Sequence, residues 1–191
     1  MKVLLGMPAG STVKTATMES IVNALFASPV PISFAIKEGA LGPDNRAQLA
    51  YIALANEFSH VWLVDADMTF PADTLARLLA HDKDIVGAAY NYRRLPIQTV
   101  VKMQTGTGEV IVPDSLPSAL FQCYAIGSGC KLIKTSALKR IPPPWFSIRH
   151  DAQGRMDRSD DVWFCEQAKS VGIETWCDPT LDVKHVGDYA F

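Results

Sequence analysis

Strand-like and helix-like segments alternate through the first ninety residues of this chain. Short apolar runs predict a buried strand at 2–7 and further strands at 31–37, 60–65 and 84–90. Helical spacing of apolar residues predicts helices at 15–27, at 45–58 and after Pro71. This alternation is typical of an α/β fold with a mostly parallel central sheet that has helices on both faces.

The second half of the sequence is less regular. Apolar segments at 99–104 and 109–113 flank Gly-Thr-Gly, which predicts a small antiparallel hairpin. Further strands are predicted at 121–126, 130–134 and 174–177, a loop at 141–149, a helix at 160–171 and an irregular tail from 178 onwards. With 191 residues, 48% of them hydrophobic, the chain can form one core, so we expect a single domain over 1–191.

Composition excludes several classes of protein. The net charge of −2 gives no sign of a nucleic-acid-binding surface. No apolar run approaches the about 18 residues that cross a bilayer, and the first ten residues lack the apolar core of a signal peptide. The four cysteines form no C-x-x-C pair, so we expect reduced core thiols, no zinc site and a cytoplasmic location.

The third predicted strand ends in two carboxylates, Asp65 and Asp67. Such a pair is costly inside a protein unless a cation or solvent separates the charges. In an extended backbone, residues two apart point the same way, so both carboxylates could face one Mg²⁺ or Mn²⁺. The alternative is that Asp67 caps the next helix and Asp65 accepts a bond from a backbone amide. A second D-x-D, Asp82–Lys83–Asp84, lies at a helix-to-strand junction and predicts a solvated turn.

Other polar or tight turns follow the first two predicted strands, at Pro8-Ala9-Gly10 and after Lys37. In parallel sheets, ligands bind beyond the carboxyl ends of the strands. The sequence therefore predicts a binding site where these turns meet the Asp65–Asp67 pair.

Residues 44–93, DNRAQLAYIALANEFSHVWLVDADMTFPADTLARLLAHDKDIVGAAYNYR, resemble the nucleotide-sugar half of GT-A fold glycosyltransferases, in particular small bacterial and phage proteins of the family-2-like type. The resemblance implies that residues 1–95 bind the donor, with Pro8 and Ala9 near the nucleotide. It implies that Asp65 contacts the nucleoside and that Asp67 binds Mn²⁺ or Mg²⁺. Arg46 could reach the nucleotide or diphosphate, or could simply begin a helix.

Three segments of the second half fit the same resemblance and imply that residues 96–191 form the acceptor and catalytic half. GSGCKLIKTSALKRI resembles the acceptor-side strand, in which Gly127, Ser128 and Gly129 would let the donor sugar approach the backbone. SDDVWFCEQAKSVG carries Asp160 and Asp161, the candidate catalytic pair, where the family usually has Glu-Asp, and the resemblance implies that Asp161 would be the catalytic base. DVKHVG carries a histidine, His185, that would complete the metal shell.

Simpler roles exist for several of these side chains. Asp160 and Asp161 follow Ser159, where acidic residues stabilise a helix through its dipole. His185 could be a structural histidine, and Arg93 and Arg94 could be solvated. Trp145 and Phe146 could stack on an acceptor sugar or pack in the core.

The resemblance implies a metal-dependent glycosyltransferase that moves a sugar from a nucleoside diphosphate sugar to the hydroxyl of a glycan or another acceptor, with inversion and an aspartate base. A nucleotidyltransferase of similar fold is one alternative, although GMPAGSTVK is a poor triphosphate loop. A non-catalytic nucleotide-sugar-binding module is another. A partner or a second copy could supply the acceptor site, so a homo-oligomer stays open.

Overall fold

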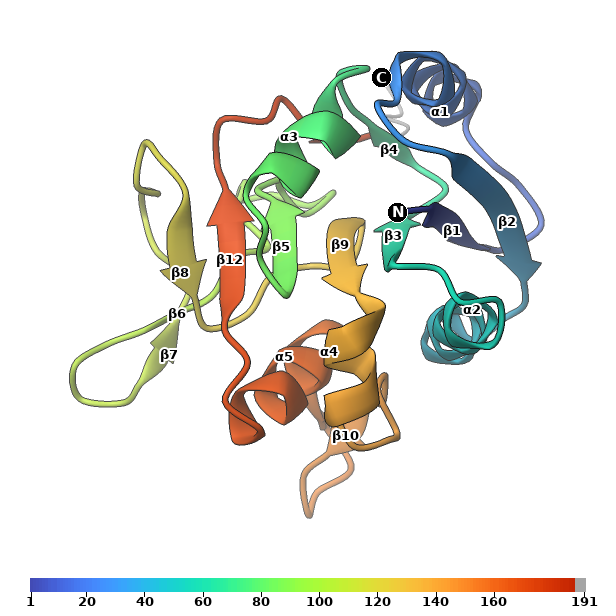
Figure 1. The fold of residues 1–191 in the computed structure, drawn as a ribbon. Coiled ribbons are helices and arrows are strands. Elements are labelled where there is room, and N and C mark those ends of the chain that lie inside the picture. The colour runs from blue at the N-terminus through green and yellow to red at the C-terminus, as the bar shows by residue number, and fades with distance from the viewer. Residues whose placement is uncertain (188–191) are drawn as a thin grey trace.

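A seven-stranded sheet runs through the computed structural model, which describes residues 1–187 (Figure 1). Its strand order is β2–β1–β3–β9–β5–β12–β8. The strands are β1 (Val3–Ala9), β2 (Ile32–Glu38), β3 (His60–Val64), β5 (Ile85–Ala88), β8 (Phe121–Cys123), β9 (Cys130–Lys134) and β12 (Thr175–Asp178). All run in one direction except β9 and β8, so the prediction of a mostly parallel sheet is confirmed.

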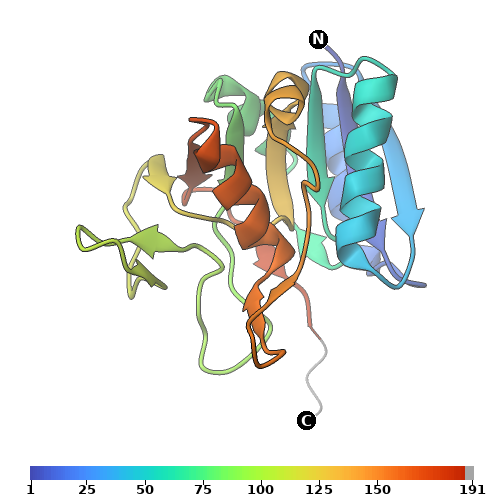
Figure 2. The ribbon, with the colours of Figure 1, turned by 90° about the horizontal axis from the view of Figure 1, so that it is seen from below.

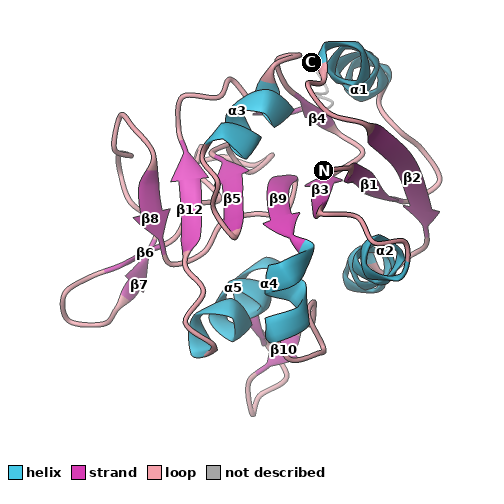
Figure 3. Cartoon of the chain, viewed as in Figure 1, coloured by secondary structure: helices cyan, strands magenta, loops and turns pink. Residues whose placement is uncertain are grey.

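Helices cover both faces of this sheet, as predicted (Figures 1 and 3). The helices α1 (Thr15–Ala27) and α3 (Thr74–Ala80) pack on one face. On the other face lie α2 (Gly42–Ala55), α4 (Thr135–Arg140) and α5 (Asp160–Ser170). The strand β3 shows why its sequence is apolar throughout. Trp62 and Val64 enter the core on the first face, whereas Val61 and Leu63 enter the core on the second.

The sequence did not predict that β9 would separate β3 from β5. It pairs antiparallel with both, with Trp62 opposite Leu132 on one side and Val86 opposite Leu132 on the other. Hydrophobic pattern does not encode strand order, because a strand buried on both faces has the same composition at any central position of a sheet. The helix α2 also begins at Gly42, three residues earlier than predicted, because Pro43 is compatible with a first turn.

Three two-stranded ribbons complete the fold. The predicted hairpin is confirmed as β6 (Met103–Gln104) and β7 (Val110–Ile111). The strands β10 (Arg149–His150) and β11 (Met156–Arg158) form a second ribbon, visible in Figure 2 as the orange hairpin beside α5, at the end of a segment predicted to be a loop.

The third ribbon corrects the prediction of an irregular tail, as far as Gly187. The strand β4 (Met68–Thr69) pairs antiparallel with β13 (Lys184–His185), and His185 lies opposite Met68. The Val186 amide donates to the carbonyl of Asp67 at 2.7 Å. This pairing brings the tail to the segment that follows β3.

Burial decides two further predictions. Trp145 and Phe146 are 6% and 5% exposed, and Phe146 stacks on Phe164 with ring centroids 4.9 Å apart, so core packing is right and acceptor stacking is wrong. All four cysteines are free and buried, as expected of core thiols.

Within residues 1–187, no helix has the length and apolar character needed to cross a membrane.

Candidate functional site

A cleft of about 540 Å³ opens at the carboxyl ends of β1 and β3. Segments far apart in the sequence meet there, and the predicted residues that line it are Pro8, Ala9, Arg46, Asp65, Asp67 and His185. Arg93, considered from the sequence as a solvated residue, lines it as well. The position agrees with the rule that ligands bind beyond the carboxyl ends of parallel strands.

Asn45 holds the wall of the cleft in place. Its side-chain amide donates to the carbonyls of Ala9 and Gly39 at 3.3 and 3.2 Å, and the Gly39 amide donates to Ala9 at 3.1 Å. A Cβ on Gly39 would lie 2.7 Å from the Asn45 Oδ1, so a larger residue would not fit there. These bonds tie the end of β1 to the loop before α2, which places the next residue, Arg46, in the cleft.

The backbone of the D-x-D motif is a turn, which corrects the prediction of an extended segment. The strand β3 ends at Val64, and the Met68 amide donates to the Asp65 carbonyl at 3.3 Å. The two carboxylates therefore have different partners, although both line the cleft. The alternative roles are wrong too, since Asp65 binds a guanidinium and Asp73 occupies the N-cap position of α3.

Arg46 joins two carboxylates from distant parts of the chain. The terminal nitrogen Nη2 donates to both oxygens of Asp65, at 2.8 and 3.0 Å, and the terminal nitrogen Nη1 donates to Asp160 at 2.6 Å. Burial acts to lower the pKa of Arg46, but Asp65, Asp161 and Asp160 raise it well above its ordinary value. The guanidinium is therefore a permanent positive charge at the floor of the cleft.

Asp67 has two basic partners at the edge of the same cleft. Its Oδ2 is 3.0 Å from Arg93, and its Oδ1 is 3.2 Å from the Nε2 of His185. The other ring nitrogen of His185 is 3.3 Å from the Asn91 carbonyl oxygen. Burial acts to raise the pKa of Asp67, but the hydrogen bond and charge of His185, together with the charge of Arg93, lower it below its usual range.

These contacts define what kind of cation the site could take. Within residues 1–187, no group of three or more His, Cys, Asp or Glu side chains is arranged to hold a metal ion. Asp67 and His185 supply one oxygen and one nitrogen, and Arg93 occupies the second oxygen of Asp67. Mg²⁺ and Mn²⁺ often take only one or two protein ligands together with phosphate oxygens. The pair therefore fits a cation that is shared with a phosphorylated ligand, and does not fit one that the protein holds alone.

A buried turn at residues 127–129 connects the cleft to the second acidic pair. The Gly129 carbonyl accepts from the Asp65 amide at 3.1 Å, and the Ser128 amide donates to Asp161 at 3.0 Å. Gly127, Ser128 and Gly129 are all buried in this conformation. Their predicted contact with a donor sugar stays a prediction, and it would require the turn to open.

The two glycines of this turn have a structural role that the sequence did not reveal. The Gly129 amide donates to the Tyr90 hydroxyl at 2.8 Å, and a Cβ on Gly127 or on Gly129 would overlap this hydroxyl. Burial, with a further effect of Asp161 and Asp65, raises the pKa of Tyr90 well above its ordinary value, so the phenol stays neutral. Glycine is needed here because the Tyr90 ring fills the space that a side chain would take.

We expect Gly127→Ala to lower the free energy of unfolding by about 1–3 kcal/mol, the usual cost of overpacking a core. The added methyl group would meet the Tyr90 hydroxyl, which is buried. Urea denaturation followed by fluorescence measures the change. In a Tyr90→Phe background the same substitution should cost less, and an equal cost in both backgrounds would contradict this explanation.

The two neighbouring acids of α5 differ in accessibility. Asp160 is 8% exposed and pairs with Arg46. Burial and the neighbouring Asp161 raise the pKa of Asp160, and Arg46 offsets only part of this effect. Asp161 lines a second cavity of about 450 Å³. Both residues also lie in the first turn of α5, so the helix-dipole role applies to them as well.

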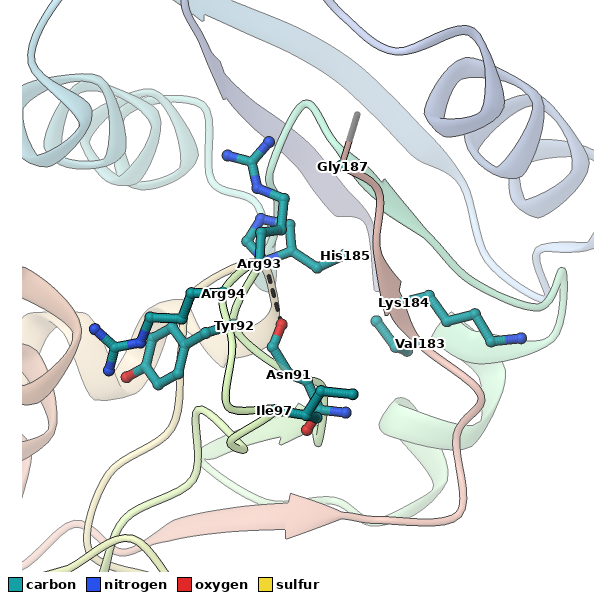
Figure 4. Close-up of a pocket in the computed structure, with 9 residues that line it drawn as sticks. All are labelled: Asn91, Tyr92, Arg93, Arg94, Ile97, Val183, Lys184, His185 and Gly187. Carbon is teal, nitrogen blue, oxygen red and sulfur yellow. Dashed lines mark hydrogen bonds between the residues drawn. The ribbon is translucent and has the colours of Figure 1, made fainter. Parts of the chain in front are cut away.

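A third cavity of about 560 Å³ lies beside the cleft and shares Arg93 and His185 with it (Figure 4). Tyr92 and Arg94 line both this cavity and the one that contains Asp161. The three spaces therefore follow one another along the surface, from the carboxyl end of β1 to the start of α5.

Comparisons with known proteins add one finding about the fold. No protein-family model matches the sequence, and no curated protein is significantly similar to it. Among solved structures, A197 from STIV superimposes with a TM-score of 0.69, over 98% of this chain and 87% of that one, at 17% sequence identity. The two proteins share a fold. At this level of identity the likeness carries no further conclusion.

Sequence reasoning missed a fully buried residue behind the site, Lys131. Its ammonium group donates to the Ser128 hydroxyl at 3.1 Å and lies 5.2 Å from the centroid of the Phe164 ring. Its positive charge also acts to lower the pKa of Asp160. The sequence does contain a signal for this residue, which is a lysine inside the apolar strand CKLIK, because a buried ammonium group needs a polar or charged partner close by.

Asp82 is the solvated turn residue that was predicted, and it pairs with Lys134 at 2.7 Å.

Proposed function

We propose that this chain is a metal-dependent glycosyltransferase of the GT-A-like type, which moves a sugar from a nucleoside diphosphate sugar to an acceptor hydroxyl. One observation carries the proposal. One cleft at the carboxyl ends of β1 and β3 is lined by residues from three separate segments, namely Arg46, the Asp65–Asp67 pair and His185. An accessible carboxylate, Asp161, lines a cavity farther along the same surface.

The cleft suits a nucleotide in both shape and chemistry. Pro8 and Ala9 offer apolar walls, and Asp65 offers carboxylate oxygens to the hydroxyls of a ribose. Asp65 is held by two hydrogen bonds from Arg46, so its position is fixed before a ligand arrives. Arg46 adds positive charge beneath a diphosphate, although its hydrogen bonds to Asp65 and Asp160 limit direct contact.

Asp67 and His185 are the residues that would hold Mn²⁺ or Mg²⁺ together with the diphosphate. A bound cation would supply Lewis-acid stabilisation of the negative charge on the leaving diphosphate. Arg93 would have to release Oδ2 of Asp67, and its guanidinium would then be free to pair with a phosphate oxygen. The Asp67 carboxylate would thus pair with Arg93 in the free protein and bind the cation in the complex.

Asp161 takes the role of general base. The acceptor oxygen attacks C1 of the sugar from the face opposite the diphosphate, and the bond from C1 to the phosphate oxygen breaks. The electron pair of that bond stays on the diphosphate, and the acceptor proton moves to the Asp161 carboxylate. The result is inversion at C1. The Ser128 amide, 3.0 Å from Oδ1, fixes this carboxylate and leaves it accessible to the cavity.

A thermal-shift screen of nucleoside diphosphates and their sugars, each with and without Mn²⁺, tests the proposal. We expect one nucleotide series to raise the melting temperature, and to do so more strongly with the cation, since a ligand that binds only the folded state stabilises it. Slow donor hydrolysis in the same samples would support an enzyme. Binding without turnover would favour the binding module, and pyrophosphate release from a nucleoside triphosphate and a sugar phosphate would favour the nucleotidyltransferase. Cytoplasm remains the expected compartment.

Asp67→Asn should abolish the effect of Mn²⁺ on donor binding, because an amide oxygen is a weaker ligand and carries no charge. Isothermal titration with the nucleoside diphosphate found by the screen, with and without Mn²⁺, measures this effect. Asp182→Asn is the matched control, since Asp182 is an exposed carboxylate paired with Lys184 outside the cleft. An unchanged response to Mn²⁺ in Asp67→Asn would refute the metal role.

A further inference from the structure

Two arginines of the described chain have no carboxylate partner. Of the eight arginines in the sequence, six form ion pairs with Asp or Glu within residues 1–187, and Arg94 and Arg149 do not. Each of the two stacks on an aromatic ring instead, Arg94 on Tyr92 at 4.8 Å and Arg149 on Trp163 at 4.8 Å. Only Arg94 lines the cavities described above.

Arg94 lies where two cavities meet. Figure 4 shows its side chain against the Tyr92 ring, and both residues also line the cavity that contains Asp161. Within residues 1–187, the cavity drawn in Figure 4 is lined by Arg93, Arg94, Lys184 and His185 and by no acidic residue. Apart from its stacking on Tyr92, the guanidinium of Arg94 has one long polar contact within residues 1–187, at 3.5 Å to the side chain of Gln98. It is therefore available to a ligand.

Two of the three acids of the Asp161 cavity are paired with Arg158, and the third is Asp161 itself. Arg158 binds Asp157 at 2.6 Å and Glu166 at 2.8 Å, and the Tyr124 hydroxyl also donates to Glu166 at 2.6 Å. The cavity contains a further half-buried cation, Lys102, for which no ion pair is present within residues 1–187. Backbone hydrogen bonds to Ala125 and Tyr124 fix the Lys102 backbone at the wall of this cavity.

We propose that the acceptor is a hydroxyl-bearing anion, a sugar or similar molecule with a carboxylate or phosphate group, whose charge binds to Arg94 and Lys102 while its hydroxyl meets Asp161. The inference rests on the proposed function and adds the class of acceptor. A guanidinium that has no carboxylate partner within residues 1–187 and is fixed by an aromatic ring suits a planar or tetrahedral oxyanion. Burial and Asp161 raise the pKa of Tyr92 and Arg94 lowers it, so Tyr92 is within electrostatic reach of both groups.

Binding can be tested without turnover, on the full chain. Glucuronate, glucose 6-phosphate and glucose serve as carboxylate, phosphate and neutral probes in NMR titrations that follow the backbone amides of Tyr92 and Lys102. We expect at least one anionic probe to bind about tenfold more tightly than glucose, because hydrogen bonds to charged groups are stronger than neutral ones. A preference for one anion identifies the source of the charge. Equal affinity for all three probes, or no saturable binding, would overturn the proposal.

Substitutions test which residues cause the preference for an anionic probe. Arg94→Gln and Lys102→Gln should each reduce the preference for the anionic probe about tenfold. Arg149→Gln is the matched control, because Arg149 also stacks on an aromatic ring without a carboxylate partner and does not line either cavity. If Arg149→Gln weakens binding as much as Arg94→Gln, the effect is a general loss of positive charge and the proposed site is wrong.

The two proposals fail in different ways. If the nucleotide screen gives no ligand but anionic probes still bind through Arg94, the cavity is an anion-binding site, and the glycosyltransferase proposal fails together with the acceptor role of that site. If a donor binds and is hydrolysed but the anionic probes show no preference, the glycosyltransferase stands and the anionic acceptor is wrong. In an active preparation, transfer to glucuronate or glucose 6-phosphate should exceed transfer to glucose by a similar factor.

Discussion

Asp161→Asn is expected to slow sugar transfer about 10²–10⁴-fold and to leave donor affinity unchanged, because a positioned base contributes a factor of this size. Asparagine keeps the shape of the side chain and can still accept a bond from the Ser128 amide, which lies 3.0 Å from the present carboxylate. The loss would therefore be of proton acceptance and not of local structure. Single-turnover transfer and titration with the nucleoside diphosphate separate the two effects.

Asp160→Asn is the comparison that makes this result specific. Asp160 is 8% exposed and bound to Arg46 at 2.6 Å, so it is poorly placed to receive a proton from an acceptor. Its substitution should change stability more than it changes the chemical step. A large loss of turnover in Asp160→Asn, with nearly normal turnover in Asp161→Asn, would mean that the base is Asp160.

The second large effect concerns stability. Arg46→Met should lower the free energy of unfolding by about 3–5 kcal/mol, since removal of one member of a buried ion pair leaves charges uncompensated. The Arg46 side chain is 12% exposed, and it neutralises Asp65 and Asp160, whose side chains alone are 23% and 12% exposed. Chemical denaturation measures the change. Arg46→Lys is the control, and it should recover part of the stability because it restores the charge without the bidentate geometry.

The loss in Arg46→Met should depend on pH in a defined direction. The pKa of Asp160 is raised in the folded protein, by burial and by Asp161, above its value of about 3.9 in an unfolded chain. Ionisation of such a group costs folding stability as the pH rises through the folded pKa, and the cost grows when Arg46 is absent. The difference between the wild type and Arg46→Met should thus be larger near about pH 7 than near about pH 4. A difference that does not change with pH would assign the loss to packing.

The sequence predicted the position of the site better than its internal contacts. Asp65 and Asp67 were expected beyond the end of a buried strand, and both line a cleft there. The expectation that they point the same way was wrong, because the chain turns after Val64 to begin β4. A local rule about extended backbone fails where a later segment, β13, pairs with the residues that follow the motif.

The turn at 127–129 shows a related limit. Two glycines around a serine indicate close approach of something to the backbone, and the sequence favoured a sugar. The structure places the Tyr90 hydroxyl there, contributed by a residue 37 positions before Gly127 and positioned by the sheet. A glycine pattern in one sequence indicates that another group lies close to the backbone, but it does not identify that group.

Local physics therefore determined the fold class, the helices on both faces and the carboxyl-end location of the cleft, because hydrophobic period and strand-end polarity are encoded within a few residues of each element. Only the tertiary structure decided the partners. It placed Arg46 against Asp160, 114 positions away, and brought His185 to Asp67 through a strand pairing. It also left Arg94 without a carboxylate partner in the part of the chain that the structure describes. Such contacts depend on strand order and on the crossing of distant segments, which no local pattern contains.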